Sequence, residues 1–86
     1  MSDWSRQIAL EDAFYEMHGI KPQVFYLRIT RDSYKIKLVH NEQEVELTEV
    51  MDKGLTKEVT LNYNGLKKGF SSYHTAEQEA ALILRG

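Results

Sequence analysis

The chain has 86 residues, of which 42% are hydrophobic and 28% charged, and its formal net charge at pH 7 is −2. This is an ordinary globular composition, so we expect a single domain over residues 1–86, with no membrane-spanning segment and no signal peptide. The absence of cysteine excludes disulfides and thiolate metal sites and fits a reducing cytoplasm. The slightly acidic charge argues against indiscriminate nucleic-acid binding, which needs a dominant basic surface.

A first helix is predicted from Ser2 or Asp3 to His18, because either residue can accept hydrogen bonds from first-turn amides. Gly19 can adopt the left-handed conformation that ends a helix, and Pro22 prevents its continuation.

This first helix carries apolar residues on two opposite sides. One side has the i, i+3, i+4, i+7 spacing of a core stripe and consists of Leu10, Ala13, Phe14 and Met17. The other side consists of Trp4, Ile8 and Tyr15. Because exposed aromatic patches mark interaction sites, we predict that this second side binds another protein or a second copy of the chain. The alternative is that the C-terminal helix covers it.

Alternating apolar and polar residues follow the helix and predict four antiparallel strands. Tight turns at residues 32–33 and 41–42 and a three-residue loop at 52–54 would set their register. The expected pairs are Ile29 with Ile36, Leu27 with Leu38, Leu38 with Val45, Ile36 with Leu47, Leu47 with Val59 and Val45 with Leu61. In this register the large apolar strand residues, Phe25 included, face one common side of the sheet.

A type I′ turn at Asn64-Gly65 leads into residues 66–72, which would place Lys68 on the inner side. This segment is a short edge strand, a bulged strand or a loop. The segment "YHTAEQEAALILRG" predicts a last helix, with Thr75 and Gln78 as a capping box. Its apolar face consists of Ala76, Ala80, Ile83 and Leu84.

The predicted fold is therefore α+β: an N-terminal helix, a four- to five-stranded antiparallel β-meander and a short C-terminal helix, with both helices packed on one sheet face. An open sheet and a small closed barrel both stay possible, because twist and bulges decide between them.

The glutamates of "KLVHNEQEVELTEV" predict a solvated strand face on which Glu46 faces Lys37 and Glu49 lies near Lys57 at the sheet margin. Glu44 and Glu46 would stand about 6.7 Å apart, close to the spacing of successive phosphates. An inhibitor that presents these two carboxylates to a basic protein groove is the weaker alternative.

A cationic part of the outer sheet face supports a second interpretation. Arg28 would lie opposite Lys37, with Lys35 and Tyr26 beside them, and residues 63–74 add lysines and aromatics without an acid. Aromatic side chains between cations can stack bases while the cations neutralise phosphates. The candidate nucleic-acid-binding residues are Tyr26, Arg28, Lys35, Lys37, Lys67, Lys68 and Tyr73. The alternative is that these lysines only keep an edge strand soluble.

The sequence contains no catalytic or cofactor-binding motif. His18, His40 and His74 share no metal-ligand spacing, and neither GxGxxG nor GxxxxGK[ST] occurs. We therefore expect no catalytic residues, no cofactor and no metal site.

The order helix, strands, helix, ending in "TAEQEAA", is superficially similar to double-stranded RNA-binding domains. That family begins its last helix with a basic KKxAK-like motif, where this chain reads "TAEQE". "GFSSYHTAEQEAA" also resembles the strand-then-helix ending of AP2-like and integrase arm-binding domains, which read DNA with the sheet face. That resemblance implies contacts by Arg28, Lys35 and Lys37.

The leading prediction is a small non-enzymatic cytoplasmic protein of bacterial or phage type, an adaptor or inhibitor that binds another protein or itself. The alternative is a nucleic-acid-binding module that uses the basic part of the sheet and residues 63–74.

Overall fold

The computed structural model describes the backbone of residues 3–86 and the side chains of residues 5–86. It confirms the α+β fold, with helix α1 (Asp3–His18) before the sheet and helix α2 (Tyr73–Arg85) after it. The strands are β1 (Gln23–Thr30), β2 (Ser33–His40), β3 (Gln43–Asp52), β4 (Leu55–Tyr63) and β5 (Leu66–Phe70). They form one antiparallel sheet in the order β1-β2-β3-β4-β5, so the sheet is open, with β1 and β5 at its edges.

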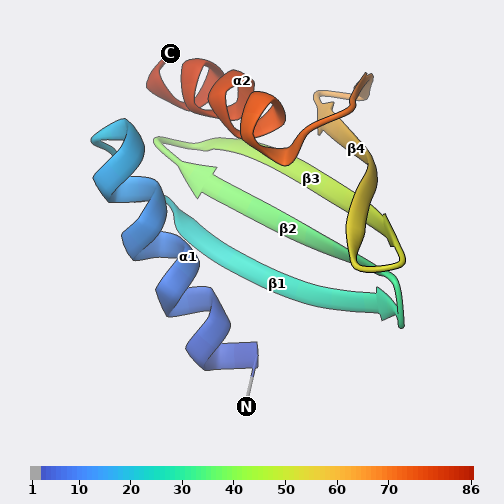
Figure 1. Cartoon of the computed structure of the whole chain (residues 1–86). Helices are drawn as coiled ribbons and strands as arrows, with labels where there is room; N and C mark the ends of the chain where they lie inside the picture. Colours follow the sequence, from blue (N-terminus) through green and yellow to red (C-terminus); the bar gives the residue numbers. More distant parts are fainter. Residues whose placement is uncertain (1–2) are drawn as a thin grey trace.

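Both helices lie on one face of this sheet. Figure 1 shows α1 beside β1 at one side of the sheet and α2 across its other half. The contacts agree, because α1 touches β1 whereas α2 touches β3, β4 and β5. The opposite sheet face has no helix on it within the described residues.

The C-terminal end of α1 has the predicted cap, whereas the N-terminal start of α2 does not. Gly19 adopts φ +75°, and its N–H donates to the Tyr15 carbonyl at 2.8 Å, which is the predicted left-handed helix end. Helix α2 begins at Tyr73 with Ser72 as N-cap and no side-chain capping bond. The predicted capping box of Thr75 and Gln78 is therefore wrong, because the helix has already begun before Thr75.

Three tight turns carry two left-handed residues each, the type I′ geometry that matches strand twist. Their φ values are 51° and 65° at Asn41-Glu42, 54° and 79° at Lys53-Gly54, and 51° and 80° at Asn64-Gly65. The turns predicted at 41–42 and 64–65 are confirmed. The predicted three-residue loop at 52–54 is wrong, because Asp52 already pairs with Leu55.

The central register is partly as predicted. Ile36 lies opposite Leu47 and Leu38 opposite Val45, which confirms the second hairpin. Leu47, however, lies opposite Leu61 rather than Val59, because the tighter turn and an irregularity between Val50 and Met51 move the pairing. This shift is by two residues, so the same side chains still face the core.

The register of the first hairpin is predicted wrongly, and the difference changes which side chains of β1 face the core and which are exposed. Its turn lies at residues 31–32, since Thr30 pairs with Ser33, and an irregularity follows between Arg28 and Thr30. Leu27 consequently lies opposite Lys35 instead of Leu38. The shift is by an odd number of residues, so β1 turns its other face to the core. Val24 and Tyr26 are buried, and the predicted core residues Phe25, Leu27 and Ile29 are exposed.

The core lies between the sheet and the two helices. Its buried members are Phe14, Val24, Tyr26, Ile36, Leu38, Val45, Leu47, Val59, Leu61, Ala76, Ala80, Ala81 and Leu84. Small alanines on α2 let that helix lie close to the strands. On α1, Phe14 is buried and Leu10 packs at the margin of the core, but the predicted stripe residues Ala13 and Met17 are exposed.

Candidate functional site

The sheet face opposite the helices is not covered by any described element; we call it the open face. Strand residues point alternately to the two faces, so the register decides which side chains it carries. They include Phe25 and Leu27 from β1, Lys35, Lys37 and Val39 from β2, Glu44, Glu46 and Thr48 from β3, Thr60 and Asn62 from β4, and Lys67 from β5.

One margin of the open face is apolar. Phe25, Leu27 and Ile29, which we call the apolar stripe, are 44%, 59% and 50% exposed. Phe25 and Leu27 also border a hollow of about 270 Å³ whose other side includes Lys35 and Lys37. Adjacent large apolar side chains on a sheet surface are typical of a binding site, whereas single ones are not.

The centre of the open face carries paired charges. Lys35 Nζ lies 3.2 Å from Glu46 Oε2, and Lys37 Nζ lies 3.2 Å from Glu44 Oε1. Lys37 is directly opposite Glu46, as predicted, but both ion pairs run diagonally between β2 and β3. The result is a row of cations beside a row of carboxylates, and each row neutralises the other.

The structure divides the predicted nucleic-acid-binding residues between the two sheet faces. Lys35, Lys37 and Lys67 share the open face, and Lys35 and Lys67 border the same hollow of about 330 Å³. Tyr26 is buried on the helix side.

Arg28 is also on the helix side. It lies opposite Tyr34 instead of Lys37, and its Nη2 donates to the Tyr26 hydroxyl at 3.0 Å. The predicted cluster of Arg28 with Lys35 and Lys37 therefore does not form, because the register of β1 places its odd and even residues on the opposite sides from those expected.

The remaining predicted residues lie near α2. Lys68 pairs with Leu61, faces the helix side and places its Nζ 3.5 Å from Glu79 Oε1. Residues 66–70 form a true edge strand, β5, so the inward lysine is satisfied by a carboxylate of α2. Tyr73 opens α2 and packs against the core.

The predicted protein-binding residues of α1 are partly described. Ile8 is 39% and Tyr15 56% exposed, and α2 does not cover them. The side chain of Trp4 lies outside the described residues. The apolar stripe on β1 was missed by sequence reasoning, although "VFYLRI" carries apolar residues at both alternate positions, a signal that one set must face outward.

Glu49 is the buried charged residue of the sheet, at 5% exposure. The prediction that it lies near Lys57 at the sheet margin is wrong: it lies opposite Tyr34 and Val59, on the core side. The Tyr34 phenol donates to one carboxylate oxygen and the Thr56 hydroxyl donates to the other. These two bonds satisfy the charge that burial would otherwise penalise.

Two tyrosines near Glu49 have raised pKa values in the folded protein. Burial, and then the hydrogen bond to the Glu49 carboxylate, raise the pKa of Tyr34 well above its usual range. Burial, and then the Glu77 charge, raise the pKa of Tyr73 likewise.

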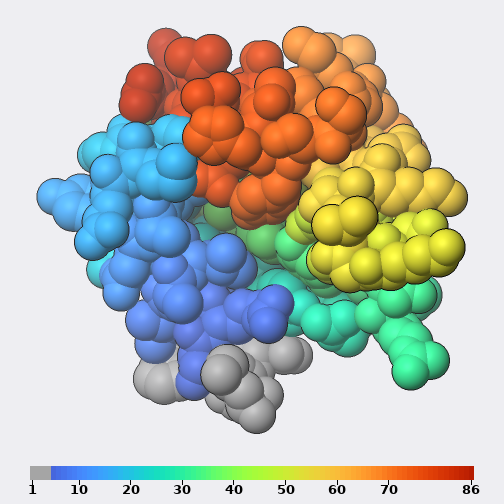
Figure 2. All heavy atoms as spheres, in the orientation of Figure 1, coloured from blue at the N-terminus to red at the C-terminus, as the bar shows by residue number. Residues whose placement is uncertain are grey.

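Green and teal atoms of the sheet are visible between α1, α2 and the yellow β4 segment in Figure 2, so the helices do not close over the sheet completely.

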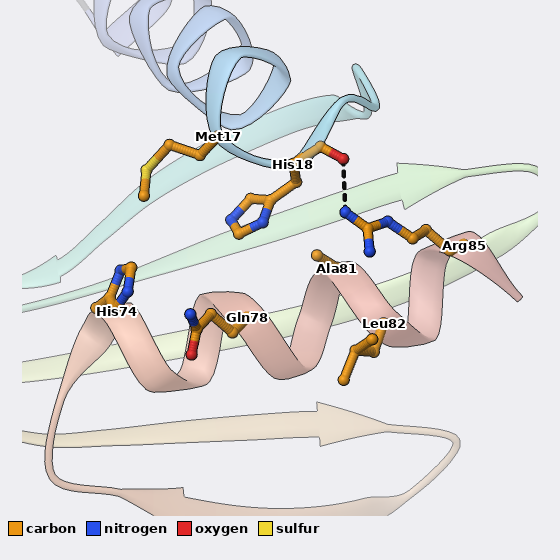
Figure 3. A pocket seen from close by; sticks show the side chains of 7 residues that line it. All are labelled: Met17, His18, His74, Gln78, Ala81, Leu82 and Arg85. Atoms are coloured by element: carbon orange, nitrogen blue, oxygen red, sulfur yellow. Dashed lines mark hydrogen bonds between the residues drawn. The ribbon is translucent and has the colours of Figure 1, made fainter.

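A hollow of about 400 Å³ lies where the end of α1 meets α2. Figure 3 shows Met17 and His18 facing α2 across it, with His74 at the start of that helix. His18 Nε2 lies 2.9 Å from Glu77 Oε1, and Arg85 Nη2 donates to the His18 carbonyl at 2.7 Å. These polar contacts join the two helices, so we assign these residues a structural role.

Within the described residues, no group of three or more His, Cys, Asp or Glu side chains is arranged to hold a metal ion. None of the helices in that part of the chain has the length and apolar character needed to cross a membrane. In comparisons with protein-family models, curated proteins and solved structures, nothing matches this chain.

Proposed function

We propose that this protein is a small, cytoplasmic, non-enzymatic binding protein that acts through protein–protein contact at the open face. The observation that supports this most is the apolar stripe: Phe25 and Leu27 are about half exposed on a sheet face without a covering helix, and Ile29, at the irregularity of β1, is half exposed beyond them. Exposed apolar area of this kind gains roughly 25 cal/mol per Å² when a partner covers it.

The charges of the open face favour a protein over a nucleic acid. Lys35 and Lys37 are each within 3.2 Å of a carboxylate on β3, so their charge is already compensated. Glu44 and Glu46 would also repel phosphates that approach the centre of this face.

The partner that fits best is a second copy of the chain. A two-fold axis parallel to the strands, between β2 and β3, would stack two open faces so that the cation row of each copy lies over the carboxylate row of the other. Each apolar stripe would then lie over Thr60 and Asn62 of the other copy.

The size of the open face is compatible with such a dimer. The four strands that would overlap, β1 to β4, about 4.8 Å apart and about eight residues long at about 3.3 Å per residue, span roughly 500 Å² before side-chain relief is counted. A standard interface buries about 800 Å² per partner.

Charge-reversed variants test this arrangement directly. One variant carries Lys35→Glu and Lys37→Glu, and the other carries Glu44→Lys and Glu46→Lys. Each alone should be monomeric in sedimentation equilibrium at about 0.1 mM, because like charges would face each other. An equimolar mixture should form the heterodimer, because the carboxylate rows then meet lysine rows on both sides.

Leu27→Asp supplies the apolar test, and Leu82→Asp is its control, since Leu82 is exposed on α2 away from the open face. Leu27→Asp should be monomeric and Leu82→Asp should behave as wild type. A monomeric wild-type protein at about 0.1 mM would overturn the proposal. Nucleic acid that copurifies at low salt and is lost in the Lys35→Glu, Lys37→Glu variant would favour the nucleic-acid alternative instead.

A further inference from the structure

We infer that the groove between β5 and α2 binds an extended, acidic segment of another protein, which adds to the sheet as a strand beside β5. This groove, which we call the edge groove, has a volume of about 370 Å³ and is lined by Leu61, Tyr63, Leu66, Lys68, Glu79 and Ile83, with Lys67 at its rim. It lies on the helix side and at the sheet margin, so it is separate from the open face and does not rest on dimer formation.

Side chains of α1 hydrogen-bond to the outward amides of one sheet edge, β1, whereas the other edge, β5, has no such bonds from a described side chain. This difference points to the edge groove. At β1, the outward N–H groups of Val24 and Tyr26 donate to Glu11 Oε2 at 3.3 Å and to Gln7 Oε1 at 2.9 Å. Helix α1 thereby caps this edge and blocks the addition of another strand.

The β5 edge has no such cap. The type I′ turn makes Tyr63 and Leu66 a hydrogen-bonded pair, so alternate pairs along β4 and β5 are also bonded. Lys67 and Gly69 lie between these pairs and direct their N–H and C=O groups away from β4. No described side chain hydrogen-bonds to the amides of these two residues, so they are available to the backbone of an incoming strand.

The edge groove supplies a place for one side chain of that strand. Leu61 forms its buried floor, Ile83 of α2 forms a wall, and Leu66 is 74% exposed at its mouth. In a strand added to β5, alternate side chains would point toward α2 and thus toward this apolar surface. An aliphatic side chain fits this position best.

Charge selects an acidic segment. Residues 63–74 contain two lysines and no acid, and Lys67 and Lys68 point to opposite faces of the same edge. The Nζ of Lys68 lies 3.5 Å from Glu79 Oε1, so the charge of Lys68 is compensated like those of Lys35 and Lys37. Lys67 forms no ion pair with a described residue, so it is the cation that favours a carboxylate at this edge. Pairing of two β5 edges would bring these lysines together, so a second copy is disfavoured and a carboxylate-bearing strand is favoured.

The test uses two synthetic ten-residue peptides with blocked ends, one alternating Asp with Val and Leu, the other with Lys in place of Asp. In a ¹⁵N-labelled sample of the whole chain, the acidic peptide should shift the amide resonances of β5 and the facing side of α2. It should also slow hydrogen exchange of the Lys67 and Gly69 amides at least tenfold. The lysine peptide should bind at least tenfold more weakly.

Variants separate the backbone, apolar and charge contributions. Lys67→Glu with Lys68→Glu should lower affinity for the acidic peptide at least tenfold, whereas Lys53→Glu with Lys57→Glu, the same charge change elsewhere, should leave it within about threefold. Gly69→Pro removes an outward N–H while Phe70 keeps its bond to β4. Leu66→Asp replaces the apolar side chain at the mouth of the groove with a charged one, at an exposed position. It takes the place of the proline variant in the test if that variant does not fold.

Three results would overturn the inference: no shift on β5 at millimolar acidic peptide, equal binding of both peptides, or shifts confined to the open face. The monomeric Leu27→Asp variant should bind the acidic peptide as wild type does. Its binding therefore distinguishes failure of the edge groove from failure of the dimer.

Discussion

Tyr34 donates its phenolic hydrogen to the buried carboxylate of Glu49, the residue directly across from it on β3. Thr56 donates to the other oxygen of the same carboxylate. The carboxylate thus joins β2 to the end of the β3–β4 hairpin on the core side of the sheet. Both donors to this carboxylate are hydroxyl groups.

Glu49→Ala should lower the free energy of unfolding by about 1.5–3 kcal/mol, because two partly buried hydroxyls lose a charged acceptor. Glu49→Gln should cost less, since its amide oxygen can still accept one of the two bonds. Urea denaturation at pH 7 measures both. Glu16→Ala on the exposed side of α1 is the control and should change stability by about 0.5 kcal/mol or less. Equal losses for the buried and the exposed glutamate would contradict the assigned role.

Alkaline pH should destabilise the protein through Tyr34 and Tyr73. Their pKa values are raised in the folded state, so above about pH 10 the unfolded chain releases phenolic protons that the native state still holds. The unfolded state then binds fewer protons, and the free energy of unfolding falls as pH rises. Urea denaturation between about pH 9 and 11 should show this loss, and Tyr73→Phe should make it shallower. Tyr15→Phe, on the exposed side of α1, should keep the wild-type slope.

Glu42→Gly should stabilise the protein. Glu42 adopts φ 65° at the second position of a type I′ turn, where a side chain costs roughly 1–2 kcal/mol and glycine costs little. After the greater flexibility of glycine in the unfolded chain is deducted, we expect a gain of about 0.5–1 kcal/mol. Gly65→Ala at the equivalent position of the last turn should lose about 1 kcal/mol. Thermal and urea unfolding of both variants check the sign, and a destabilised Glu42→Gly would refute the reasoning.

The contact of His18 with Glu77 should couple α1 to α2. Their side chains are 9% and 13% exposed and 2.9 Å apart, and the His18 ring also packs on Phe14. A double-mutant cycle of His18→Ala and Glu77→Ala should give a coupling energy of about 1 kcal/mol. The exposed pair of Asp12 and Lys21, at 3.4 Å, should give less than about 0.5 kcal/mol in the same measurement.

Gln7→Leu should open the capped edge of β1. The side-chain oxygen of Gln7 accepts the Tyr26 N–H at 2.9 Å, so its removal leaves an outward amide without that acceptor. Hydrogen exchange at Tyr26 should accelerate about tenfold, while the amide of Phe25, whose residue pairs with Lys37 of β2, should be unaffected. An unchanged rate at Tyr26 would mean that the helix itself, rather than this bond, protects the edge.

Much of the fold follows from local patterns. The helix α1, its Gly19 end and the alternation in β2, β3 and β4 each depend on neighbours within a few residues, and these predictions are confirmed, whereas only Leu10 and Phe14 of the predicted α1 stripe pack against the core. The same alternation also placed Glu49 on the side of Val45 and Leu47, but a charged residue on that side is normally read as a strand end. Its burial depends on Tyr34 and Thr56, which lie 15 and 7 residues away.

The sequence by itself determined the order of the elements, the shared inner face of β2, β3 and β4, the two-residue turn at 41–42 and the type I′ turn at 64–65, because those features arise from side-chain periodicity and, at Asn64-Gly65, from residues that tolerate positive φ. Only the tertiary structure decided which face of β1 is buried, since "VFYLRI" has apolar residues at both alternate positions and a bulge near Arg28 sets the register. That choice puts Phe25, Leu27 and Ile29 on the outside. The candidate binding surface is therefore a product of long-range pairing, which no short stretch of the chain encodes.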